Sequence, residues 1–175
     1  ATMGHQARAA KPDEMKAMQS ILAKSLEEGA FGFSTGLESG PELGATEAEV
    51  AELCRVPAEV GALYATHTRN RDGHAVDAID EAIRTAEAAG VRLQISHLTP
   101  STGRRQLERA IERVEHARQR GGEVAFDMHT RLRAAVLRPK TSFEADQNEG
   151  HTDEGPRRLG ATRGGGGAGG RRRHG

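Results

Sequence analysis

The sequence has few aromatic residues and a single cysteine. Of its 175 residues, one is Tyr, four are Phe and none is Trp, and the apolar fraction is 35%. A hydrophobic core must therefore come from Ala, Val, Leu and Ile. Because Cys54 has no partner for an internal disulfide, we expect a reducing environment, and we assign a cytoplasmic location.

Long apolar runs and an excess of charge are also absent. No run approaches the roughly 20 residues of a membrane span, and residues 1–8 lack the apolar segment of a secretory signal. The formal net charge is zero, so the whole chain is no evident polyanion binder. The first residue is Ala rather than Met, which leads us to expect a fragment of a longer protein.

Four short apolar runs with β character recur along the chain, at residues 30–33, 63–66, 93–96 and 124–126. The stretches between them show helical periodicity. Strands and helices that alternate at this spacing predict parallel βα units, about four in number, and thus an α/β fold. The apolar positions of the four expected helices are Met15, Met18, Leu22 and Leu26; Val50, Leu53 and Val60; Val76, Ile79, Ile83 and Ala86; and Leu107, Ile111 and Val114.

Local signals mark the ends of these helices. Thr46 and Glu49 have the spacing of a capping box at the start of the second helix. Gly90 closes the third helix and Gly121 follows the fourth. Pro57 should kink or end the second helix, at a cost of about 3 kcal/mol.

Two histidines end neighbouring predicted strands, and each follows a small hydroxyl residue. His67 and His97 are 30 residues apart in the sequence, about the length of one strand–helix–strand unit. Right-handed crossovers bring the carboxyl ends of parallel strands to one face, with strands roughly 4.8 Å apart. The pair thus predicts two ligands of a Zn²⁺-like ion, and the alternative is two unrelated hydrogen-bonded histidines. A catalytic zinc usually needs a third protein ligand.

Other polar residues near this face have weaker claims. Asp127 ends the fourth strand and is a candidate to orient a histidine or accept a proton, or simply to cap a loop. Arg69 is a candidate to bind a substrate carboxylate, with a surface ion pair as the equal alternative. His74 and His129 are expected to be solvated loop histidines, and Cys54 a buried, inert thiol.

The regular pattern ends after Leu132, which divides the chain into residues 1–132 and 133–175. The second part is low in complexity and its end, residues 160–175, consists almost wholly of Gly, Arg and Ala. We expect it to be disordered, because it cannot bury enough apolar surface to offset its ordering entropy. Its arginines allow weak phosphate contact, but without aromatic residues nucleic-acid binding is not expected. The alternative function is a non-enzymatic α/β fragment whose basic tail mediates association or weak nucleic-acid contact.

Three strings in order resemble one enzyme family. These are residues 29–37 (GAFGFSTGL), 64–69 (YATHTR) and 94–98 (QISHL), within a resemblance that covers roughly residues 3–132. The chain resembles the N-acyl-D-amino-acid deacylase (D-aminoacylase) branch of the amidohydrolase superfamily. The resemblance implies a metal-dependent (β/α)₈ TIM-type barrel, of which this chain carries part. It also implies hydrolysis of the amide bond of N-acyl-D-amino acids, with one or two Zn²⁺ ions.

The resemblance also implies roles for individual residues. His67 and His97 match metal-ligand histidines after barrel strands five and six, and Asp127 falls at strand seven. Ser34 and Arg69 are then candidate substrate contacts. The family's His-x-His pair, ligand Cys and strand-eight Asp have no match here, so no catalytic residue is assigned and we expect the chain to be inactive alone. A partial barrel has open sheet edges, which favour self-association.

Overall fold

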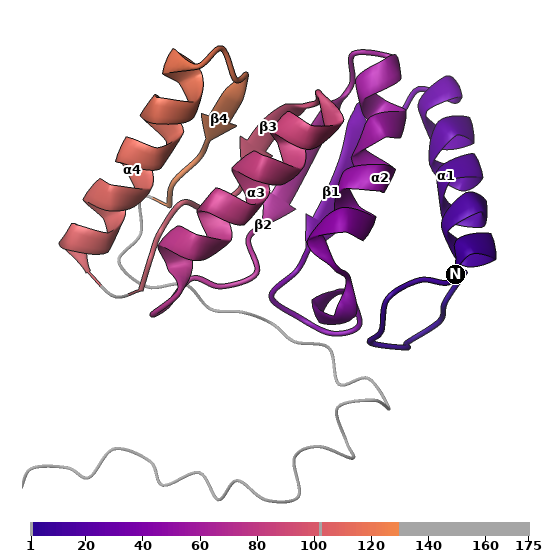
Figure 1. Ribbon diagram of the computed structural model, residues 1–175, viewed down its shortest axis with the longest axis horizontal. Helices are drawn as coiled ribbons and strands as arrows, with labels where there is room; N and C mark the ends of the chain where they lie inside the picture. Colours follow the sequence, from indigo (N-terminus) through magenta and orange to yellow (C-terminus); the bar gives the residue numbers. More distant parts are fainter. Residues whose placement is uncertain (1, 102, 130–175) are drawn as a thin grey trace, which may run out of the picture. The chain divides into compact units, whose positions relative to one another are not determined.

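In the residues that the structure describes, four helices and four parallel strands alternate (Figure 1). The structure, a computed structural model, describes residues 2–101 and 103–129, and the elements belong to one compact unit. The expected boundary at 132 and the expected tail, 133–175, lie outside the described residues. The elements are α1 (Pro12–Glu27), β1 (Gly32–Gly36), the 3-10 turn η1 (Glu42–Gly44), α2 (Glu47–Glu59), β2 (Leu63–His67), α3 (Ala75–Ala89), β3 (Arg92–Ile95), α4 (Arg104–Gln119) and β4 (Val124–Phe126).

The strands form one parallel sheet in the order β1-β2-β3-β4, as the four predicted βα units require. The main difference lies in β1, which begins at Gly32 and not at Ala30. Phe31 is 96% exposed and stays outside the sheet. A Cβ on Gly32 would lie 2.1 Å from the Leu63 carbonyl oxygen, so only glycine allows β1 to approach β2 this closely.

The helix ends largely follow the predicted signals. Thr46 Oγ1 accepts a hydrogen bond from the Glu49 N–H at 3.2 Å, but Glu49 does not complete the capping box. Its carboxylate instead accepts from the Ala10 N–H at 3.0 Å, which ties the segment before α1 to α2. Helix α2 ends two residues after Pro57, and Gly90 closes α3 in the left-handed conformation, with φ 69°.

The core lies between the helices and one face of the sheet. Helices α2, α3 and α4 cover that face, and α1 packs beside α2 (Figure 1). The two scarce residues Tyr64 and Cys54 are both in this core, with the expected aliphatic residues around them. Helix α1 contacts its neighbour on one side only, so its predicted apolar stripe is half-buried and no residue of the helix is fully buried.

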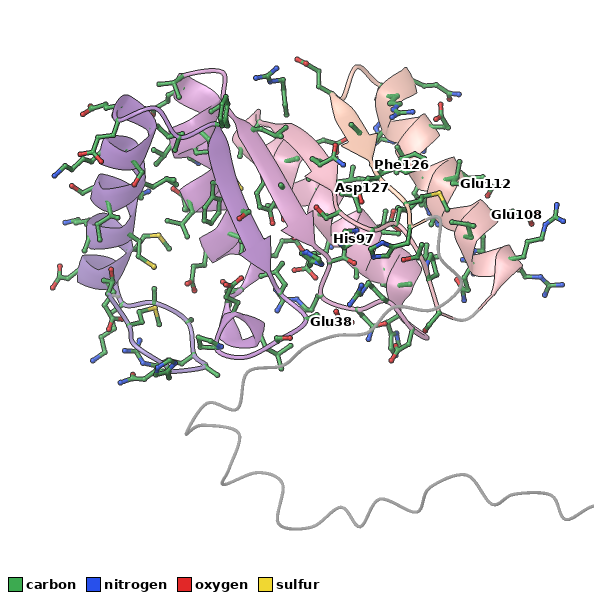
Figure 2. The ribbon with its side chains drawn as sticks, turned by 180° about the vertical axis from the view of Figure 1, so that it is seen from behind. Glu38, His97, Glu108, Glu112, Phe126 and Asp127 are labelled. Atoms are coloured by element: carbon green, nitrogen blue, oxygen red, sulfur yellow. The ribbon has the colours of Figure 1, made fainter. Side chains whose placement is uncertain are left out.

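The opposite face of the sheet carries no helix in the described part of the chain, and Figure 2 shows the strands from that side. One row across all four strands consists of Ser34, Ala65, Gln94 and Ala125. The outer two are exposed and the inner two half-buried, whereas in the row of Tyr64 on the helix side Tyr64, Leu93 and Val124 are buried and Phe33 is half-buried. In (β/α)₈ barrels the helices surround the sheet, so this open face corresponds to the barrel interior. Among the described helices none is long and apolar enough to cross a membrane.

Candidate metal centre

His67 and His97 lie side by side at the carboxyl end of the sheet. His67 is the last residue of β2, and His97 lies two residues beyond the end of the adjacent strand, β3. The Ser96 N–H donates to the Thr66 carbonyl at 2.9 Å, which continues the contact between the two strands up to the histidines. Their ring centroids are 4.8 Å apart and the ring planes are inclined at 63°. The structure therefore brings the predicted pair together.

Asp127 follows β4 directly and contacts His97, as Figure 2 shows. Its Oδ1 accepts a hydrogen bond from the backbone N–H of His97 at 2.9 Å, and its Oδ2 accepts one from Nε2 of Gln94 at 2.9 Å. Partial burial raises the pKa of Asp127, but these hydrogen bonds and the nearby His97 outweigh that effect, so the pKa lies below its usual value. Asp127 is therefore an ionised carboxylate, held in place at the side of the histidine pair.

One nitrogen of the His97 imidazole lies beside Asp127. Its Nδ1 is 2.9 Å from Asp127 Oδ1, within ion-pair distance, although the angle falls outside the range of a hydrogen bond. With Nδ1 beside this carboxylate, Nε2 is the nitrogen left to coordinate a cation.

Burial and the nearby positive groups favour the neutral form of His67. Burial lowers the pKa of His67 first, and the nearby His97 and Arg71 lower it further, against the opposing effects of Glu38 and Asp127. A metal ion binds the neutral imidazole, so a lowered pKa leaves more of this side chain ready to coordinate near pH 7. The lowered pKa of His67 therefore favours its use as a ligand of a metal ion.

The donor set is incomplete within residues 2–101 and 103–129. No group of three or more His, Cys, Asp or Glu side chains in these ranges is arranged to hold a metal ion. A third histidine, His129, is near the pair, but its ring stacks on that of His97, with centroids 4.1 Å apart and planes at 18°. Stacked rings point their nitrogens outward along parallel planes and not toward a common centre. The residues present thus fit two nitrogen ligands of a larger set.

Arg69, a candidate substrate contact, has other partners in the structure. Its guanidinium binds both carboxylate oxygens of Glu81 and donates to the carbonyls of Leu43 and Ala45. These are the contacts of the ion-pair alternative, because they occupy all three guanidinium nitrogens. The structure thus places Arg69 in the ion pair and not at the histidine site.

The remaining candidates are placed as follows. Ser34 is exposed on the open face of β1, and His74 forms a solvent-exposed pair with Asp77 at 3.3 Å. Cys54 is fully buried, and burial raises the pKa of its thiol to about 12, which agrees with the expectation of an inert thiol. His129 is an exposed loop residue, as expected, and its ring also stacks on that of His97.

Gln94 is the contact residue that the sequence did not reveal. It belongs to the string that resembles the family, but nothing in its residue type distinguishes it from a solvated strand residue. In the structure Gln94 lies opposite Ala125 of the adjacent strand, and Ala125 is two residues before Asp127. This register brings the side chain of Gln94 close to that of Asp127. The usable signal was the alternation along β3, which puts Gln94 on the open face beside the end of β4.

Comparison with known proteins gives homologues of one kind, while no family model matches the chain. The chain is 38% identical over 127 residues to the N-acyl-D-glutamate deacylase of Alcaligenes xylosoxydans xylosoxydans, which covers 69% of this chain and 26% of the relative. It is 34% identical over 134 residues to the D-aminoacylase of the same organism, covering 74% of this chain and 27% of the relative. The chain thus spans about a quarter of the length of these relatives.

A solved structure agrees with the sequence comparison. The crystal structure of N-acyl-D-glutamate deacylase from Bordetella bronchiseptica, complexed with zinc and a phosphonate inhibitor, matches 75% of this chain and 28% of its own chain. The TM-score is 0.70 and the sequence identity 34%. This match confirms the expected fold, part of a (β/α)₈ barrel, and the expectation that zinc occurs in the family.

Proposed function

Because the chain belongs to the D-aminoacylase branch of the amidohydrolase superfamily, we propose that its βα units are part of a metal-dependent hydrolase of N-acyl-D-amino acids. The observation that carries the proposal is the pair His67 and His97, whose rings from adjacent strands lie 4.8 Å apart. When bound, a zinc ion lowers the pKa of a coordinated water toward about 7 and polarises the scissile carbonyl. The bond cleaved is the amide between the acyl group and the amino acid.

The residues of this chain have distinct roles in the proposal. His67 and His97 hold the ion, and His67 does so readily because its lowered pKa keeps the ring neutral. Asp127 positions His97 through the backbone N–H of that residue. Ser34 is exposed on the open face of β1, two residues before the carboxyl end of the strand, and stays a candidate contact for a substrate bound at that end of the barrel.

The general base of the reaction is not assigned to this chain. Asp127 is the carboxylate next to the histidines, but its two oxygens already accept hydrogen bonds from His97 and Gln94. It is therefore poorly placed to take a proton from water. We propose that the 175-residue polypeptide hydrolyses N-acetyl-D-amino acids poorly or not at all, and robust zinc-dependent turnover by the purified chain would contradict this.

Zinc binding by the purified chain tests the metal site directly. We expect calorimetric titration to show one zinc per chain, and the His67→Ala/His97→Ala double variant to lose it. His74→Ala is the matched control. His74 is a solvent-exposed histidine near the start of α3, and its side chain pairs with Asp77. If the double variant binds zinc as the wild type does, the pair is not the metal site.

Open sheet edges support a proposal about assembly. In the described sheet β1 and β4 are the outer strands, and each has one neighbour only. Unpaired parallel edges and an uncovered sheet face favour association with further strands, so we propose that the chain self-associates. Sedimentation velocity over a tenfold concentration range should show a concentration-dependent increase in mass, and a single monomeric species throughout would contradict the proposal.

We also propose that the protein is cytoplasmic. Cys54 is free and buried, and a lone reduced thiol is typical of proteins from a reducing compartment. Fractionation of cells that produce the protein, followed by immunodetection, tests this location.

A further inference from the structure

His97 has a backbone conformation that is uncommon for a residue other than glycine. Its φ angle is +59°, and it is the one non-glycine residue with positive φ in the part of the chain that the structure describes. Residues with a Cβ adopt this left-handed region rarely, and they keep it only where surrounding contacts enforce it. The contacts that enforce it here also decide where the imidazole points.

Asp127 supplies those contacts on both sides of His97. Its carboxylate Oδ1 accepts the N–H of His97 at 2.9 Å, and its backbone carbonyl accepts the N–H of Leu98 at 2.8 Å. Two successive N–H groups therefore bind to one residue at the end of the adjacent strand. This fixes the turn that begins at His97 relative to the end of β4.

Gln94 in turn fixes the carboxylate of Asp127. Its Nε2 donates to Asp127 Oδ2 at 2.9 Å, while the Asp127 N–H donates to the Ile95 carbonyl at 3.1 Å. The side-chain rotation of Asp127 is thus set by Gln94 and its backbone by β3. With Oδ2 bound to Gln94, Oδ1 is directed at His97.

We propose that Gln94 and Asp127 are positioning residues, which together hold His97 in its left-handed conformation and so direct its imidazole toward His67. Neither residue is assigned a part in bond cleavage. The effect on zinc rests on the proposed metal site, whereas the effect on the backbone of His97 does not.

The hydrogen bond between Gln94 and Asp127 can be broken and restored by exchange of the two functional groups. Gln94→Glu puts a carboxylate opposite that of Asp127, so donor and acceptor no longer match and the like charges repel. Adding Asp127→Asn to that variant supplies a new amide donor for the introduced carboxylate. The asparagine retains an oxygen that can accept the N–H of His97.

The first measurement is nuclear magnetic resonance without metal. It compares the wild type with the Gln94→Glu variant and the Gln94→Glu/Asp127→Asn variant. We expect Gln94→Glu to move the Cα shift and the amide coupling of His97 away from positive φ, and the double variant to return them. Asp77→Asn is the matched control, because it alters a different Asp–His pair that is exposed to solvent. It should leave the signals of His97 unchanged.

Zinc affinity by competition with a chelator provides the second measurement. We expect Gln94→Glu to weaken binding by about tenfold or more, as is usual when a partner of a ligand histidine is lost, and the double variant to recover most of it. A merely structural role would lower stability without this recovery. Should Gln94→Glu fail to fold by circular dichroism, Gln94→Ala removes the donor without adding a charge and replaces it.

Two results would overturn the proposal. One is a Gln94 variant that folds and leaves the His97 backbone signals where the wild type has them. The other is a double variant in which those signals do not return. If the wild-type chain binds no zinc, the proposed metal site fails, but the resonance measurement still decides whether Gln94 and Asp127 position His97.

Discussion

Arg69 and Glu81 form a side-on ion pair that joins the loop after β2 to helix α3. Arg69 Nε lies 3.0 and 3.1 Å from the two carboxylate oxygens of Glu81, and Nη2 lies 2.8 Å from one of them. The same guanidinium donates to the carbonyls of Leu43 and Ala45 at 3.0 and 2.8 Å. One side chain therefore connects β2, α3 and the turn η1, and its geometry is that of a structural contact.

We expect Arg69→Ala to destabilise the protein markedly. The pair is 25% and 16% exposed, so removal of Arg69 leaves a largely buried carboxylate and two carbonyls without their donors. The expected loss is about 2–3 kcal/mol in the free energy of unfolding, measured by urea denaturation. Arg84→Ala is the control, because the Arg84–Glu47 pair is 56% and 40% exposed and should contribute less than about 1 kcal/mol.

The same variants separate the two interpretations of Arg69. An Arg69→Ala protein with the urea midpoint of the wild type would show that the Glu81 contact contributes little to stability. Substrate binding would then be the better explanation of Arg69. An Arg69→Lys variant retains the charge but cannot form the paired hydrogen bonds, so we expect most of the loss to remain.

Gly32→Ala should disrupt the pairing of β1 with β2. The added Cβ would lie 2.1 Å from the Leu63 carbonyl oxygen and 2.9 Å from its carbon, and both are backbone atoms that cannot move without breaking the strand pair. We expect a loss of at least about 1–3 kcal/mol, the usual cost of overpacking, again from urea denaturation.

Gly73→Ala is the matched control for that change, because no atom lies within 4 Å of its added Cβ. Its effect should stay within about 0.5 kcal/mol. Equal stability of both variants would mean that β1 is not held against β2 as described.

The period of the sequence was sufficient to predict parallel βα units, whereas the barrel was expected from the family resemblance. Four apolar runs separated by helical stripes gave the parallel order, and Gly90 and Thr46 marked helix ends that the structure retains. The start of β1 was misplaced because Phe31 is apolar, and apolar character alone does not show that a residue lies inside a sheet. Its 96% exposure is a property of the tertiary structure.

The site was predictable in part. Matching strand ends predicted that His67 and His97 lie together, and their rings are 4.8 Å apart. The register differs by one residue from the 30-residue repeat, because Thr66 lies opposite Ile95 and His97 is therefore one residue further along than His67. A histidine partner for Asp127 was among the predictions, but Gln94 as its second partner and Glu81 as the partner of Arg69 were not predictable, because both depend on side-chain directions across elements far apart in the sequence. The alternatives left open for Arg69 were separated only by the position of Glu81 on α3.

The thiol of Cys54 should be protected in the folded protein. Burial raises its pKa from 9.0 to about 12, and the side chain has no exposed surface, so both thiolate formation and access are suppressed. We expect Ellman's reagent at pH 8 to react at least about a hundredfold more slowly with the native chain than with the chain in concentrated urea. Rapid labelling of the native protein would show that the core around α2 opens readily.

Glu14 gives stability at the start of α1 a defined dependence on pH. The Arg8 side chain, and then the N–H of Lys11, lower the pKa of Glu14 from 4.5 to about 2 by hydrogen bonding to its carboxylate. Because the folded-state pKa is the lower one, the stabilisation is present above about pH 4.5 and is lost as the pH falls toward 2.

Glu14→Gln should therefore remove part of the acid sensitivity between these two pH values, seen as a smaller change in the urea midpoint. The contact is at the surface, so added salt should reduce the difference between variant and wild type. Glu28→Gln is the control, since Glu28 is an exposed partner of Lys24 at 3.7 Å and should leave the acid profile nearly unchanged. Identical profiles for Glu14→Gln and the wild type would mean that Arg8 and Lys11 do not hold this carboxylate in solution.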